Sequence, residues 1–190
     1  MVMTEEQQET KLVALQMLAK ISELPLSVKQ FHSDWILLTY DLPNTKEGTK
    51  ARYAFLNRAR YLGAMMHTES VYLMPHTDAA NAAAIVLAEA GDVYLWYTKA
   101  GSEAQSVSLT NNYDQRLAAE IAKVKERVSR ISYHSHEGHD RQVRRMARGT
   151  WTMIDGLSKA VVSRGSTELA EQLFNIITAL KYAENTTDDI

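Results

Sequence analysis

The sequence predicts an α+β fold: a ferredoxin-like domain of order β-α-β-β-α-β between an N-terminal helix and a C-terminal helical extension. Two observations support this. Strand-like apolar runs alternate with helical patterns in the middle of the chain, and the last third is apolar at helical spacing. We expect four parts: residues 1–32 as a helical arm, 33–110 as the ferredoxin-like domain, 111–185 as the helical extension and 186–190 as a disordered tail.

The first element expected is a helix over residues 4–22. Thr4 suits the N-cap position, and apolar residues then recur at helical spacing, at Leu12, Leu15, Leu18 and Ile21. Pro25 interrupts the pattern, so the helix is expected to end before it.

The predicted domain starts with the strand "WILLTYDL" (35–42) and the helix "TKARYAFLNRARYLG" (49–63), which Gly63 ends. The segment "AMMHTESVYLMP" (64–75) predicts one or two short strands. "TDAANAAAIVLAEAG" (77–91) is a second helix, capped by Thr77 or Asp78, and "DVYLWYT" (92–98) is another strand. "AQSVSL" (104–109) is a candidate for one more strand. Two helices would cover one face of the sheet, so the open face and edges predict a homodimer.

The C-terminal third predicts three helices. The first, over residues 113–133, has apolar residues at spacings of four, three, four and three: Leu117, Ile121, Val124, Val128 and Ile131. "SYHSHEGHD" then breaks the pattern. Helices are expected from Arg141 to about Val162 and from Glu168 to Ala183, the last with Leu169, Leu173, Ile176, Ile177 and Leu180 as its apolar positions.

Composition limits the classes of function. The formal net charge is −2, so contact with nucleic acid requires a local basic patch. The chain has no cysteine, which excludes disulfides and thiolate metal sites. The start of the sequence is acidic and lacks a signal pattern, and no apolar stretch approaches the roughly 18 residues of a membrane span. We therefore expect a soluble, cytoplasmic protein with no membrane partner.

The order of short motifs resembles a known group of proteins. A strand ends in Tyr40-Asp41, a helix with basic residues leads to Leu62-Gly63, and a strand contains "VYLMP" (71–75), with "VYLWY" (93–97) later in the chain. This order resembles the N-terminal domain of the chromate-resistance regulator ChrB. It is more distantly similar to the small CRISPR-associated adaptation endonuclease, the second Cas protein, and to a domain of PaaX-type repressors. The resemblance covers roughly residues 35–108 and implies a ferredoxin-like homodimer.

Asp41 has two interpretations. In the endonuclease family, the aspartate that ends the first strand meets its symmetry mate and helps to bind a divalent metal, so the resemblance implies a catalytic Mg²⁺ or Mn²⁺ site at Asp41, with Tyr40 and Ser70 nearby. A single carboxylate per protomer is a poor set of ligands for Mg²⁺, however. The alternative is that Asp41 caps or braces the turn "DLPNT".

Two basic clusters are candidate nucleic-acid contacts, because Lys and Arg release counterions from phosphates. The first comprises Lys46, Lys50, Arg52, Arg58 and Arg60. In the second, "RQVRRMAR" contains Arg141, Arg144, Arg145 and Arg148, preceded by Lys123, Lys125, Arg127 and Arg130 on the helix before. Nearby acids, Glu120, Glu126, Glu137 and Asp140, support the alternative of a helical hairpin held by ion pairs.

"HSHEGHD" contains a third candidate site. His134, His136 and His139 lie close to Glu137 and Asp140, and imidazoles with carboxylates suit Zn²⁺. The spacing is not that of the H-E-x-x-H helix motif, and an ordinary interhelical loop is the alternative.

These observations favour a non-catalytic nucleic-acid-associated or regulatory protein, built on a homodimeric ferredoxin-like domain, whose arginine-rich helices contact DNA or RNA. The first alternative is a divalent-metal-dependent endonuclease that uses Asp41 from two protomers. The second is an adaptor whose helices bind a protein partner.

Overall fold

The structure is a computed structural model, and it describes residues 12–18, 20, 34–41, 45–61, 63–68, 70–77, 80–81, 84–85 and 93–186. Along the chain lie β1 (Trp35–Tyr40), α2 (Lys46–Tyr61), β2 (Met65–Thr68), β3 (Val71–Pro75), β4 (Val93–Thr98), α4 (Glu103–His136), α5 (Asp140–Arg164) and α6 (Thr167–Asn185). Residues 12–18 are helical, as predicted; the rest of the predicted N-terminal helix, apart from residue 20, lies outside the described residues. Within these ranges, no helix is long and apolar enough to cross a membrane.

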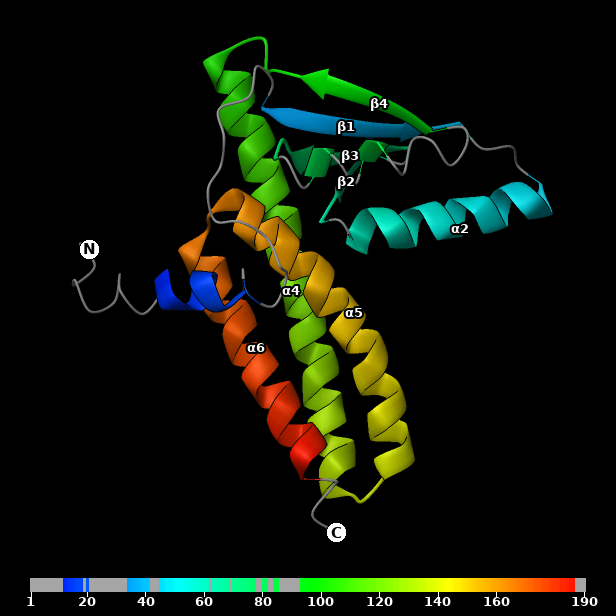
Figure 1. Cartoon of the computed structure of the whole chain (residues 1–190), viewed down its shortest axis with the longest axis vertical. Helices are drawn as coiled ribbons and strands as arrows, with labels where there is room; N and C mark the ends of the chain where they lie inside the picture. The colour runs from blue at the N-terminus through cyan, green and yellow to red at the C-terminus, as the bar shows by residue number, and fades with distance from the viewer. Residues whose placement is uncertain are drawn as a thin grey trace.

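A small sheet is joined to one end of a long three-helix bundle (Figure 1). The sheet has the order β2-β3-β1-β4, and all neighbouring strands are antiparallel. In register, Leu37 lies opposite Leu73 on one side and opposite Trp96 on the other. The α+β class is therefore confirmed, and "AMMHTESVYLMP" forms two strands.

The two faces of the sheet belong to different cores. One face packs against α2 and against the helical residues near 80–85, in a cluster of Ile36, Leu38, Phe55, Ala59, Ala64, Tyr72, Met74, Ala80 and Ala84. Thr77 caps this helical segment, because its Oγ1 accepts a hydrogen bond from the Ala80 amide at 3.1 Å. On the other face, Trp35 and Leu73 join the core of the helical bundle.

The bundle core follows the predicted apolar pattern. Leu117, Ile121, Val124, Val128 and Ile131 of α4 are all buried, and so are Leu169, Leu173, Ile176, Ile177 and Leu180 of α6. α4 is longer than expected at both ends. At its start, the Ser102 Oγ accepts a hydrogen bond from the Gln105 amide at 3.2 Å, and Glu103 complements the positive end of the helix dipole.

The candidate strand at 104–109 was therefore wrong. These residues form the first turns of α4, which runs without a break through the expected boundary at 110–111. At the other end, α4 continues to His136, so the turn to α5 is confined to residues 137–139. Gly138 makes this turn with a φ of 71°.

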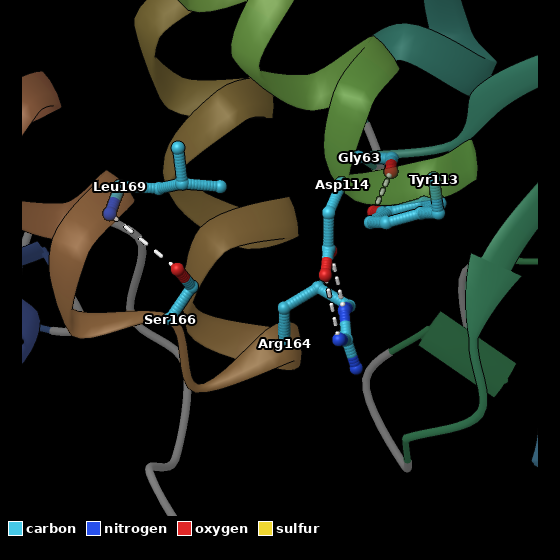
Figure 2. Close-up of polar contacts among 6 residues, drawn as sticks. All are labelled: Gly63, Tyr113, Asp114, Arg164, Ser166 and Leu169. Carbon is cyan, nitrogen blue, oxygen red and sulfur yellow. Dashed lines mark hydrogen bonds and ion pairs between the residues drawn. The ribbon is translucent and has the colours of Figure 1, made fainter. Parts of the chain in front are cut away.

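The sheet and the bundle meet at Gly63, in the turn between α2 and β2 (Figure 2). Buried Tyr113 of α4 donates a hydrogen bond from its hydroxyl to the Gly63 carbonyl at 2.8 Å. Gly63 has a φ of 79°, and a Cβ at this position would lie 2.8 Å from the Ala160 backbone nitrogen of α5. Both the conformation and the close approach therefore require glycine.

An ion pair reinforces the junction. Arg164 donates from Nε and Nη2 to the two carboxylate oxygens of Asp114, at 2.8 and 2.9 Å (Figure 2). The guanidinium carbon also lies 5.9 Å from the ring centroid of Trp35. The hydrogen bond to Asp114 raises the pKa of Arg164, and burial raises the pKa of Tyr113. The two groups keep their protons and hold α4, α5 and β1 together.

Candidate nucleic-acid interface

The arginines of "RQVRRMAR" occupy the first turns of α5. Val143 and Ala147 of this segment are fully buried and anchor the helix in the core of the bundle. The opposite face is exposed and carries Arg141, Arg144, Arg145 and Arg148. Arg141, Arg145 and Arg148 are spaced four and three residues apart, so they follow one side of the helix. The fold thus presents all four arginines to solvent.

Three of these arginines have no partner among the described residues. Within the described part of the chain, the side chains of Arg141, Arg145 and Arg148 make no hydrogen bond or ion pair; Arg144 does make an interaction. A cation without an internal partner retains its donors for an external anion, and arginine presents five of them.

Three of the four cluster cations on α4 are engaged instead; Lys125 is exposed and makes no hydrogen bond or ion pair with the described residues. Lys123 pairs with Glu120 at 2.6 Å, and Arg130 pairs with Glu126 at 2.9 Å. Arg127 donates a hydrogen bond to Thr150 Oγ1 on α5 at 2.8 Å. The expected neutralisation by nearby acids therefore occurs within α4, and it leaves the arginine face of α5 unneutralised by Glu120 and Glu126.

The basic cluster of α2 and the α5 arginines are far apart. The start of α5 is at the end of the bundle remote from the sheet, whereas α2 lies beside the sheet (Figure 1). Lys46, Lys50 and Arg60 of α2 are exposed, and Arg52 is half-buried and has an interaction of its own. The side chain of Arg58 lies outside the described residues. Members of the two clusters meet at one place: Arg60, at the end of α2, and Lys123 of α4 line the same cleft, and none of the four α5 arginines lines it.

The histidines lie at the same end of the bundle as the α5 arginines. The Nδ1 atoms of His134 and His139 are 3.3 Å apart, and the Gln142 amide nitrogen is 2.9 Å from the Nε2 of His134. His136 is exposed and does not join them. Among the residues that the structure covers, no group of three or more His, Cys, Asp or Glu side chains is arranged to hold a metal ion. The Zn²⁺ site therefore remains a prediction, and two of its three candidate histidines lie together.

Asp41 belongs to the sheet domain, whereas the arginine face lies at the end of the bundle remote from the sheet. Asp41 follows β1, its side chain is exposed, and it makes no hydrogen bond to any residue of the described ranges. The cap of α2 is Thr45, whose Oγ1 accepts from the Gly48 amide at 3.0 Å. Ser70 precedes Val71, the partner of Thr39, so Ser70, Tyr40 and Asp41 share one end of the sheet. The turn "DLPNT" that Asp41 is predicted to cap or brace includes residues 42–44, which lie outside the described residues, so this role stays a prediction.

An exposed aromatic surface covers part of the sheet. Tyr94 and Trp96 of β4 point to the face opposite α2, and each side chain is 55% exposed. The Trp96 indole nitrogen donates to Thr39 Oγ1 at 3.0 Å, which holds the ring against β1. β4 is an edge strand of the sheet. An exposed apolar patch at a strand edge is typical of a surface that contacts another chain.

Sequence reasoning missed a cleft between the sheet and the bundle. It has a volume of about 660 Å³ and lies between the end of α2, β2, α4 and α5. Its cations come from two helices far apart in the chain: Arg60 from α2, and Arg116 and Lys123 from α4. Apolar side chains of β2 and α5 line much of it, including Met65, Met66 and Leu157.

Comparison with known proteins adds no relative to these observations. No family model matches the chain, and no curated protein or solved structure shows a significant match. The resemblance to the ChrB, adaptation-endonuclease and PaaX domains therefore remains a prediction from short motifs.

Proposed function

We propose that the protein is a non-catalytic, nucleic-acid-associated protein that contacts phosphates through the arginine face of α5, comprising Arg141, Arg144, Arg145 and Arg148. The observation that carries this proposal is the exposure of all four side chains on one short segment, with three of them unpaired within the described chain. Helix α5 has its positive end at this segment, which adds to the attraction for phosphate.

The proposal includes a ferredoxin-like fold for the sheet domain. In the observed order, β3 lies between β1 and β2, and β1 lies between β3 and β4. The two strands of each strand–helix–strand unit are thus separated in the sheet by one other strand, as in the ferredoxin-like (split βαβ) arrangement. This supports both the fold and the resemblance to the regulator domains.

We also propose a homodimer formed through the aromatic surface of β4. A second copy would cover Tyr94 and Trp96, which one protomer leaves exposed. Dimerisation would also double the number of arginine faces, and two weak phosphate contacts on one particle bind a long nucleic acid more tightly than either alone.

Fluorescence anisotropy of labelled single- and double-stranded DNA and RNA tests the function. With the pure protein in Mg²⁺, we expect binding to be tight at low salt and to fall steeply as salt rises, because the contacts are to phosphates. The same samples, run on a denaturing gel, should show intact nucleic acid. Absence of binding at low salt would contradict the proposal and leave the protein-binding adaptor.

The metal-dependent nuclease is the second candidate, favoured by the exposed Asp41 carboxylate at the end of β1, which makes no hydrogen bond to the described residues. It requires a second Asp41 from a partner protomer to complete a Mg²⁺ or Mn²⁺ site. Cleavage that needs either ion and disappears in Asp41→Ala would establish it. Under the main proposal, Asp41→Ala leaves binding unchanged.

A further inference from the structure

We propose that the cleft between α2, β2, α4 and α5 binds a small organic anion with an apolar body. Nothing in the nucleic-acid proposal requires this site, because none of the four arginines of the α5 face lines the cleft. Its volume of about 660 Å³ falls within the range of roughly 300–1,000 Å³ usual for small-molecule sites.

The charge of the cleft indicates an anion. Among the described residues, its lining contains the three cations Arg60, Arg116 and Lys123 and one carboxylate, that of Glu120, which pairs with Lys123. Arg116 is half-buried and is fixed by a hydrogen bond from Nη2 to the His67 carbonyl at 3.0 Å. That bond uses one of its five donors, and the others have no partner among the described residues, which leaves them available for a ligand.

Arg60 is the freest of the three cations. Its side chain is exposed and makes no hydrogen bond or ion pair with the residues that the structure covers. It lies close enough to Tyr72 to affect that hydroxyl electrostatically. Burial raises the pKa of Tyr72, so its hydroxyl remains a protonated donor at neutral pH.

The rest of the lining suits an apolar body. Met65, Met66, Met153 and Leu157 contribute side chains from β2 and α5, and Met66 is 43% exposed. Methionine is flexible and polarisable, so it adapts to aromatic rings as well as to aliphatic chains. A purely inorganic anion would leave this apolar surface uncovered. The combination therefore favours an anionic head group near Arg60 and Arg116 with an apolar part over the methionines.

The test compares two fluorescent probes that share one aromatic body. 8-Anilinonaphthalene-1-sulfonate carries an anionic group, whereas N-phenyl-1-naphthylamine has none. We expect one sulfonate probe to bind per chain, at least about tenfold more tightly than the neutral probe, because only the sulfonate meets the cations. Equal affinity of the two probes would overturn the proposal.

Three variants locate the binding. Arg60→Gln should weaken sulfonate binding about five- to tenfold while it leaves the neutral probe unchanged. Thr152→Trp, at an exposed lining position, should fill the cleft and abolish binding of both probes. Lys181→Gln, on the exposed surface of α6, removes the same charge elsewhere and should have no effect.

Two results would overturn the assignment. If Thr152→Trp folds with an unchanged thermal midpoint and still binds the sulfonate probe normally, the probe lies elsewhere, for example on the aromatic surface of β4. If an unlabelled oligonucleotide displaces the probe from the wild-type protein, the cleft belongs to a nucleic-acid surface rather than to a small-molecule site.

Discussion

The two ends of α5 carry arginines in opposite environments. At its end, Arg164 is half-buried, paired with Asp114 through two hydrogen bonds and placed over Trp35. At its start, Arg141, Arg145 and Arg148 are exposed and have no partner within the described chain. Arg164 therefore stabilises the fold, whereas the three arginines at the start of α5 are available to an external anion. The difference lies in the neighbours that the fold supplies, which the local sequence does not reveal.

The largest effect on the free energy of unfolding is expected at the junction between the sheet and the bundle, which Arg164 also stabilises. Gly63→Ala should destabilise the protein by about 2–4 kcal/mol, because the new Cβ meets the Ala160 backbone and the φ of 79° is unfavourable for alanine. Gly138→Ala at the arginine end is the matched control. Its φ of 71° is similarly unfavourable but its Cβ would have no atom within 4 Å, so about 1 kcal/mol is expected. Denaturant unfolding measures both, and equal losses would show that close packing at Gly63 is unimportant.

A second prediction compares the two kinds of arginine directly. Arg164→Met should lower the free energy of unfolding by about 1–2 kcal/mol, since it removes a two-point charged hydrogen bond that is partly exposed to solvent. Arg145→Met should change it by less than about 0.5 kcal/mol, as is usual for an exposed surface site. Urea unfolding curves at neutral pH give both values. A destabilisation at Arg145 as large as that at Arg164 would contradict the distinction between the two ends.

The third and smallest effect concerns Tyr113. Tyr113→Phe should cost about 1 kcal/mol at neutral pH, because Phe cannot donate the hydrogen bond to Gly63. Because burial raises the pKa of Tyr113, the folded protein keeps a proton that the unfolded chain loses above about pH 10. Its contribution to stability is therefore complete below that pH and declines as the pH rises further.

The free energy of unfolding, measured from pH 8 to pH 11.5, tests whether the contribution of Tyr113 to stability declines as the pH rises. The wild-type protein should lose stability above about pH 10 more steeply than Tyr113→Phe, so the difference between the two proteins should shrink there. A difference that stays constant across this range would show that Tyr113 ionises as freely in the folded protein as in the unfolded chain.

Local patterns predicted much of the fold. The apolar spacing of α4 and α6 identified their buried positions, and the strands and the helix ending near Gly63 followed from short runs and a glycine. The candidate strand at 104–109 was wrong because the cap supplied by Ser102 and the continuation of α4 outweigh a short alternating pattern. A single β-like run of six residues cannot reveal that it is the beginning of a 34-residue helix.

The sites were less predictable than the fold. The arginine cluster could be predicted because its members lie close together in the sequence. The Asp114–Arg164 pair and the cleft join residues that lie about fifty or more positions apart, and no spacing rule connects them. The histidines were close in sequence, yet the end of α4 places His136 away from His134 and His139. Closeness in the sequence therefore predicted three histidine ligands, whereas the fold brings two of these histidines together.

The salt dependence of nucleic-acid binding tests the central claim most directly. Two triple variants remove the same charge: Arg141→Ala/Arg145→Ala/Arg148→Ala at the start of α5, and Lys46→Ala/Lys50→Ala/Lys99→Ala in the sheet domain. We predict that the α5 variant binds a labelled oligonucleotide more weakly than the wild-type protein. Its slope of log K against log salt should fall by about one for each phosphate that the variant can no longer neutralise, whereas the lysine variant should retain the wild-type slope. Equal slopes for the two variants would contradict the assignment of the arginine face as the nucleic-acid interface.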